Sequence, residues 1–80
     1  MPATSLVPLK RLLARRITAC ARDLNLRQIE AAEMLELTQP RLNALLKGRV
    51  ELFSLDALVQ IAVRAGLTVR VSATRRYRSA

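Results

Sequence analysis

Residues 26–48 constrain this chain more than any other segment, because their pattern predicts two short helices separated by a tight turn. The first helix is expected to begin at Gln28 and the second at Gln39. Thr38 directly precedes the second helix, and its hydroxyl oxygen can cap the first turn. Gly48 can end that helix in the left-handed conformation. The segment therefore predicts a compact unit of two helices.

The second helix of this unit carries polar side chains away from its apolar positions. Gln39, Arg41 and Asn43 present carboxamide and guanidinium groups outward. Such groups can form hydrogen bonds with base edges in the major groove of DNA. We predict base contacts for these three residues. Solvation at the surface is the alternative, and Arg41 and Asn43 could also reach phosphate.

The charge of the chain makes nucleic acid the first partner to consider. Fourteen basic residues face six acidic ones, giving +8, and twelve of the basic residues are Arg. Arg suits paired contacts with phosphate and guanine. Residues 37–50 contain three basic residues and no acidic one, whereas residues 25–36 contain three acidic residues and one basic. The predicted recognition helix is therefore basic and its supporting helix acidic.

The same composition argues against several other functions. With no His and one Cys, the chain offers no metal cluster, internal disulfide or His-activated nucleophile. We therefore expect no enzymatic activity and no cofactor. Cys20 is expected to be a buried free thiol in a reducing compartment. No apolar run approaches the ~18 residues of a membrane span, so we expect a cytoplasmic location and no membrane partner.

Two further helices are expected to flank the central unit. The first runs from Pro8 to about Leu24, and another is capped by Ser54 and ended by Gly66, with Phe53 as an apolar plug before it. A transit peptide is the alternative for residues 1–22, which are basic and amphipathic. Lys10, Arg11, Arg15 and Arg22 are expected on the solvated side of the first helix. The predicted inward positions are Leu9, Leu12, Leu13, Ile17, Cys20, Leu24, Ile29, Ala32, Met34, Leu35, Leu37, Leu42, Leu45, Leu46, Leu55, Leu58, Ile61, Ala62 and Ala65.

After Gly66 the apolar period changes to two. Leu67, Val69 and Val71 alternate with polar residues, which predicts a strand. A single strand in a helical domain has no partner in its own chain, and its unpaired backbone favours pairing with another molecule. We therefore predict these three residues as dimerisation residues of a homodimer, an association that small domains often need.

The chain also resembles a known family at residues 26–48. Leu26, Gln28, Ala32, Leu35, Gln39 and Gly48 match the pattern of the lambda-repressor-like, or XRE, family of helix-turn-helix regulators. The run from Gly48 to Leu58 is similar to the linker and helix of a compact subgroup common among antitoxins and prophage-type regulators. The resemblance covers about residues 9–71. It implies an all-α fold, a lambda-repressor-like bundle of about four helices with a short C-terminal strand that pairs across a dimer.

The family comparison adds expectations about the DNA backbone. Gln28 resembles the family residue that hydrogen-bonds a phosphate, and ordinary surface exposure is the alternative. We also expect phosphate contacts from Arg27, Thr38, Lys47 and Arg49, and ordinary surface charge is the alternative for the last two. In domain terms, residues 1–7 are expected to be a flexible arm, residues 8–72 the DNA-binding domain, and residues 73–80 a basic tail. The tail arginines Arg75, Arg76 and Arg78 could follow phosphates, enter a minor groove or only solubilise the chain.

Two positions depart from the family pattern. Glu36 stands where the turn usually has Gly, and a positive φ there would cost Glu about 1 kcal/mol. Arg27 replaces the usual capping Thr. Among the neighbouring residues only Asn25 has capping chemistry, so we expect Asn25 to cap the helix that begins at Gln28.

The residues and the resemblance together predict a homodimeric transcriptional repressor of bacterial cytoplasm, associated with the nucleoid when bound. It would place its recognition helices in successive major grooves of an inverted-repeat double-stranded operator. The alternative is the antitoxin of a type II toxin-antitoxin pair, which neutralises a toxin and represses its own operon; a charge of +8 is unfavourable toward a basic toxin. An RNA binder or a membrane-surface peptide is a third possibility, and one Phe and one Tyr offer no base-stacking platform.

Overall fold

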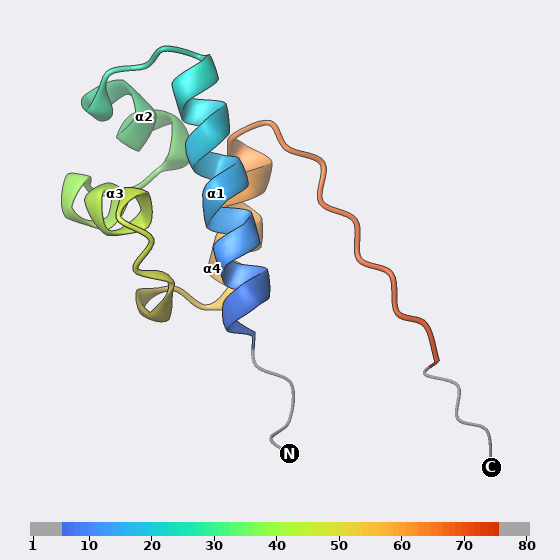
Figure 1. The fold of residues 1–80 in the computed structure, drawn as a ribbon. Coiled ribbons are helices and arrows are strands. Elements are labelled where there is room, and N and C mark those ends of the chain that lie inside the picture. Colours follow the sequence, from blue (N-terminus) through green and yellow to red (C-terminus); the bar gives the residue numbers. More distant parts are fainter. Residues whose placement is uncertain (1–5, 76–80) are drawn as a thin grey trace.

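The computed structural model describes residues 6–75, and four α-helices make up most of this region. They are α1 (Val7–Asp23), α2 (Gln28–Leu35), α3 (Gln39–Leu46) and α4 (Leu55–Arg64), with a short 3-10 helix, η1 (Val50–Leu52), between α3 and α4. Helices α1 and α4 pack side by side, and α2 and α3 lie together against one side of this pair (Figure 1). The predicted all-α class with about four helices is confirmed.

Side-chain caps fix where α3 and α4 begin. The Thr38 hydroxyl oxygen accepts a hydrogen bond from the backbone N–H three residues later at 3.3 Å, and Ser54 does the same at 3.0 Å. Each bond satisfies one of the N–H groups that a helix start leaves without a partner. Gly48 and Gly66 follow α3 and α4 with φ of +77° and +90°. The predicted caps and stops of both helices are therefore confirmed.

The start of α2 differs from expectation. Arg27, with φ −70° and ψ 159°, is the N-cap residue, and its backbone N–H donates to the Glu30 carboxylate at 2.8 Å. Asn25 was expected to be the cap, but it adopts φ +54° in the turn that follows α1. That expectation is wrong because an acidic side chain inside the helix satisfies a backbone donor at its start, as in half of a capping box.

Most predicted core positions of the last three helices are buried around Phe53, whose side chain is 2% exposed. The apolar plug before α4 is thus confirmed, and Leu37, Met34, Leu46 and Leu55 are half-buried beside the core. The buried positions that the pattern predicted are Ile17, Ala32, Leu35, Leu42, Leu45, Leu58, Ile61, Ala62 and Ala65, and to these the structure adds Ala14, Ala21, Ala31 and Val50.

Helix α1 does not bury the leucine stripe that its periodicity predicted. Ala14, Ile17 and Ala21 form the buried face, while Leu9, Leu12 and Leu24 are about half exposed. The small alanines allow the other helices to approach α1 closely, so the leucines lie on a neighbouring face. In α2, Ile29 is likewise 50% exposed against expectation. Periodicity shows where apolar surface exists, but not which part of it the same chain covers.

The predicted turn at Glu36 is confirmed. Glu36 adopts φ +58° and ψ +44° directly after α2. The N–H of the next residue, Leu37, donates to the carbonyl of Ala32 at 2.8 Å, which closes the helix end. The Glu36 carboxylate lies 3.5 Å from the guanidinium Nε of Arg64, in an exposed ion pair of small stabilising effect.

The segment after α4 runs alongside α1 as an open trace (Figure 1). Leu67 and Val69 are half-buried against the core and Thr68 and Arg70 are exposed, as the alternation predicted. Val71 is 88% exposed. Within residues 6–75, the backbone groups of residues 68–75 form no hydrogen bond, and no strand is formed. Pairing of this segment between two copies therefore stays a prediction.

The remaining predictions fall partly outside the described residues. Residues 1–5 of the predicted arm and 76–80 of the predicted tail lie there, including Arg76 and Arg78. α1 begins at Val7, inside the range expected to be an arm. No helix among the described residues has the length and hydropathy to span a membrane. The same residues contain no group of three or more acidic or Cys side chains that could hold a metal ion.

Because Glu36 has a left-handed backbone conformation, glycine should affect the free energy of unfolding differently at this position than inside a helix. Glu36→Gly removes a left-handed penalty of about 1–2 kcal/mol and adds a backbone-entropy cost of about 0.5–1 kcal/mol. Its free energy of unfolding should therefore equal that of the unmodified chain or exceed it by up to about 1.5 kcal/mol. The matched control Glu33→Gly, inside α2, should lose about 1 kcal/mol. Equal losses in urea unfolding of the two variants would contradict the role assigned to the turn.

Candidate nucleic-acid interface

The outer face of α3 is polar and fully accessible. Leu42 and Leu45 are each 1% exposed and point into the core, so helical spacing places Pro40, Asn43 and Lys47 on the opposite side. The exposed face borders a shallow hollow lined by Pro40, Asn43, Ala44, Lys47, Arg49 and Leu52. An α-helix with such a face fits the width of the DNA major groove.

The predicted base-contact residues lie in two different settings. Gln39, the first residue of α3, and Asn43, one turn later, are both exposed, and no hydrogen bond within residues 6–75 occupies either side chain. Both are available to base edges. Arg41 differs, because its guanidinium lies 4.2 Å from the centre of the Phe53 ring and donates to the Leu52 carbonyl oxygen at 3.2 Å.

The Arg41 contacts join the start of α3 to the linker that precedes α4. A cation over an aromatic face together with a hydrogen bond holds the side chain on one flank of α3, away from the outer face. The base-contact prediction for Arg41 is not tested by this geometry, but the side chain already has other partners. Sequence analysis did not foresee them because Leu52 and Phe53 lie more than ten residues later in the chain.

The predicted phosphate contacts surround α3 at three places. Arg27 and Gln28 are exposed at the start of α2, and Thr38 stands at the start of α3 with its oxygen accepting the capping hydrogen bond. Lys47 and Arg49 are exposed at the far end of α3. Neither of these last two cations forms an ion pair within residues 6–75.

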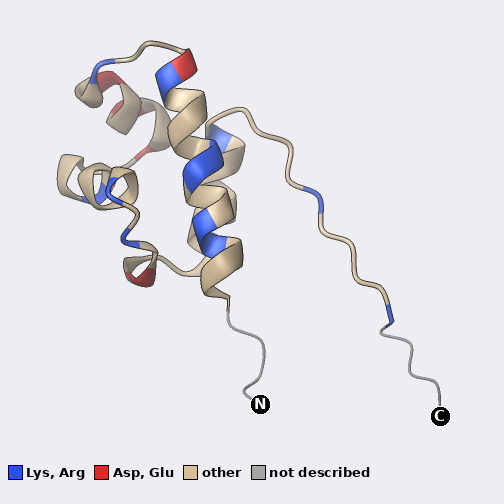
Figure 2. Cartoon of the chain, in the orientation of Figure 1, with Lys and Arg blue, Asp and Glu red and all other residues tan. Residues whose placement is uncertain are grey.

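Charge is separated between the helices. Figure 2 shows acidic residues on α2 and basic residues along α1 and in the loop after α3, with the acidic Glu51 in η1. The residues of α3 and the segment after it carry a net positive charge, whereas α2 carries a net negative charge. A positive field on this side of the molecule favours approach of a polyanion.

The N-terminus of α2 also shifts one titration. The Arg27 backbone N–H, and secondarily the Arg27 side chain at 3.5 Å, hydrogen-bond the Glu30 carboxylate and hold its pKa below the ordinary value of 4.5. Because the Arg27 guanidinium pairs with the Glu30 carboxylate, its positive charge is partly neutralised within its own helix. The ion pair is exposed, so it can open when DNA approaches.

The predicted dimerisation residues line an apolar groove on the opposite side of α1 from α3. Leu67, Val69 and Val71 form one wall, and helices α1 and α4 contribute the rest. The groove has a volume of about 240 Å³. Its helical lining consists of Leu9, Leu12, Leu13, Arg16, Leu55 and Val59. Two of the leucines that α1 leaves exposed, Leu9 and Leu12, therefore line this groove.

Comparison with known families agrees with this geometry. A family model described as a helix-turn-helix domain matches residues 2–74, which is nearly the whole chain. No curated protein matches the sequence.

The Glu30 contact leads to a prediction about acid. Because the folded pKa is lowered, the carboxylate stabilises the fold above the unfolded pKa, and this contribution is lost as the pH falls through the folded pKa. An NMR titration of the Glu30 carboxyl should give a pKa below 4.5. Arg27→Ala should keep most of the lowering, since the main donor is backbone N–H. A return to 4.5 in that variant would instead make the guanidinium the main cause.

Proposed function

The chain belongs to the helix-turn-helix domain family, and from this premise we propose that it is a sequence-specific, double-stranded DNA-binding transcriptional regulator. The observation that carries the proposal is the outer face of α3, where Asn43 and Lys47 are exposed opposite two buried leucines and Gln39 is exposed at the start of the helix. A helix fixed in this way presents the same polar groups to every DNA duplex it meets. Such presentation is the basis of direct readout.

In the proposed complex α3 enters the major groove and its two free carboxamides contact base edges. Gln39 and Asn43 can each bind the N6 and N7 edge of adenine through two hydrogen bonds. We assign Arg41 a different role from the one its sequence position suggested. Its contacts with Leu52 and Phe53 support a positioning role, in which it holds the start of α3 against the linker.

Phosphate contacts would then fix how α3 sits in the groove. Gln28 and Thr38 lie at the starts of the two motif helices, and Lys47 and Arg49 lie at the end of α3. Such contacts position a protein on the duplex without reading its sequence. Arg27 joins this group once its exposed pair with Glu30 opens.

A homodimer on an inverted-repeat operator is the proposed assembly. The backbone of residues 68–75 has no partner within the described chain, and leucines of α1 stand exposed beside it. Antiparallel pairing of Leu67–Val71 with the same segment of a second copy would satisfy the backbone groups of this range that face the partner strand and would cover the groove. A two-fold dimer would also place two α3 helices on successive half-sites.

Repression by occupying a promoter in the bacterial cytoplasm is the simplest regulatory outcome for such a dimer. A second candidate function, the type II antitoxin, needs a surface for a toxin, and the apolar groove is the described surface suited to a protein partner. We assign the groove to a second copy because its wall is an unpaired, alternating segment. The charge of +8 also disfavours a basic toxin.

Selection of bound duplexes from a random library tests the function and supplies the operator. With that operator, Gln39→Ala or Asn43→Ala should weaken specific binding by about 1–3 kcal/mol and leave binding to random duplex nearly unchanged. Arg41→Ala should instead lower the thermal stability of the free protein. If the library yields no preferred sequence, or if both carboxamide variants lose specific and random binding equally, direct readout by α3 is wrong.

The dimer is tested by proline in the unpaired segment. Val69→Pro removes a backbone donor at the centre of the proposed pairing in both subunits, so dimerisation and operator affinity should fall together. Ala73→Pro is the matched control, because it lies beyond the groove. Sedimentation at micromolar concentration measures the oligomer. A Val69→Pro variant that remains dimeric and binds the operator normally would require another interface.

A further inference from the structure

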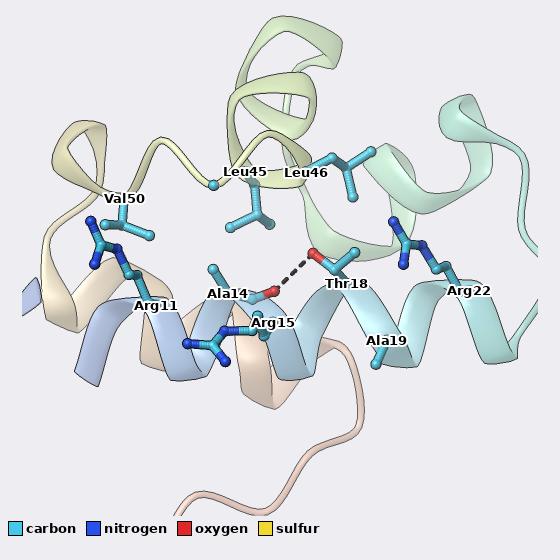
Figure 3. Close-up of a pocket in the computed structure, with 10 residues that line it drawn as sticks. Arg11, Ala14, Arg15, Thr18, Ala19, Arg22, Leu45, Leu46 and Val50 are labelled. Carbon is cyan, nitrogen blue, oxygen red and sulfur yellow. Dashed lines mark hydrogen bonds between the residues drawn. The ribbon is translucent and has the colours of Figure 1, made fainter. Parts of the chain in front are cut away.

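Arg11, Arg15 and Arg22 are exposed, as expected for the solvated side of α1, and they also line one wall of a furrow. A hollow of about 360 Å³ lies between α1 and the end of α3. Figure 3 shows Arg11 beside Val50 at one end, Arg22 at the other, and Arg15 between them on α1, with Leu45 and Leu46 of α3 across from the helix.

A second hollow extends this one toward the DNA-binding motif. It is lined by Gln28 at the start of α2 and shares Thr18, Arg22 and Leu46 with the first hollow. The two together form one continuous furrow, which we call the α1–α3 furrow. It runs from Gln28 to Arg11 along the flank of α3 that faces α1.

Positive charge in the furrow is uncompensated. Arg11, Arg15 and Arg22 are exposed, no acidic residue lines either hollow, and none of the three forms an ion pair within residues 6–75. Along α1 the first two are roughly 6 Å apart and the first and last roughly 16 Å apart, from the helical rise. The three guanidinium groups can therefore meet separate anionic groups instead of competing for one.

In the furrow, side chains and not backbone N–H groups are available to bind anions. The N–H groups of Gly48, Arg49 and Val50 at the end of α3 all donate to carbonyl oxygens of the chain. The Thr18 hydroxyl donates to the Ala14 carbonyl at 2.8 Å, so it too is occupied. The apolar residues on the floor, Leu45 and Val50, are already buried and offer a protein segment little further area.

From these observations we propose that the α1–α3 furrow holds the sugar–phosphate backbone of one DNA strand beside the major groove that α3 occupies. The inference rests on the proposed function. When α3 lies in a groove about 8.5 Å deep, a phosphate backbone passes along each of its flanks. Gln28 already marks one end of the furrow as a phosphate site in that proposal, and the arginines continue the same line along α1.

The test compares two faces of one helix. The double variant Arg11→Gln/Arg15→Gln removes two furrow cations, whereas Lys10→Gln removes one cation of α1 that lines neither the furrow nor the apolar groove. Binding to the selected operator is measured at salt concentrations from about 50 to about 200 mM. Phosphate contacts make the affinity for DNA depend strongly on salt in this range. Circular dichroism and sedimentation check that each variant stays folded and keeps the oligomeric state of the unmodified protein.

The double variant should lower the slope of log K against log salt by about two units per bound subunit, because each phosphate contact contributes about 0.9 unit. Lys10→Gln should leave the slope unchanged. The charge-preserving variant Arg11→Lys/Arg15→Lys should restore most of the slope, which a merely structural role would not produce. In hydroxyl-radical footprinting, the double variant should lose protection of the backbone sugars beside the phosphates assigned to Arg11 and Arg15.

Two results would overturn the proposal. One is a double variant whose slope and footprint match those of Lys10→Gln, since the arginines would then be solvated in the complex. The other is a double variant that loses binding to poly-L-glutamate, a probe for acidic polypeptides, but keeps the salt slope of the unmodified protein for DNA. That result would assign the furrow to an acidic protein segment. Failure of the proposed function is distinct from both, because the unmodified protein would then select no duplex at all.

Discussion

Burial of one side of α3 is the constraint on which the interface depends. Leu42 and Leu45 are each 1% exposed, and truncating a buried leucine costs about 2–5 kcal/mol, a large share of the about 5–15 kcal/mol that stabilises a typical domain. Rotation of α3 about its axis would expose both, so the helix has one orientation. Asn43 and Lys47 face outward because these leucines face inward, and Gln39 is exposed at the first position of the helix. The Thr38 cap and Gly48 then set where that face begins and ends.

Local chemistry explains which parts of the fold the sequence could predict. The caps at Thr38 and Ser54 and the tight turn between α2 and α3 depend on neighbours within a few residues, and all three are confirmed. The Asn25 cap failed for a related reason. Several nearby groups compete to satisfy the first N–H groups of a helix, and the Glu30 carboxylate does so here at 2.8 Å.

Non-local packing explains what the sequence could not predict. The Arg41 guanidinium meets Phe53 across the linker, and nothing in the α3 pattern indicates that partner. The leucines of α1 show the same limit, since their spacing marks an apolar stripe while the core is covered by Ala14, Ile17 and Ala21. For the candidate site, sequence could therefore propose residue types and exposure for Gln39 and Asn43. It could not show that Arg41 is held on the flank of the helix.

Helix α1 connects the two surfaces that the proposals use. Arg15 lines the furrow beside α3, and the next residue, Arg16, lines the apolar groove beside residues 67–71, because successive residues of a helix point about 100° apart. Because α1 carries both the furrow side and the groove side, a rigid α1 would fix the distance between the DNA backbone and the dimer axis. Its alanine face packs into the core, which leaves α1 no freedom to turn one surface without the other. Half-site spacing in the proposed complex would then be set by the α1 helices that flank the dimer axis, together with the α3 helices that enter the grooves.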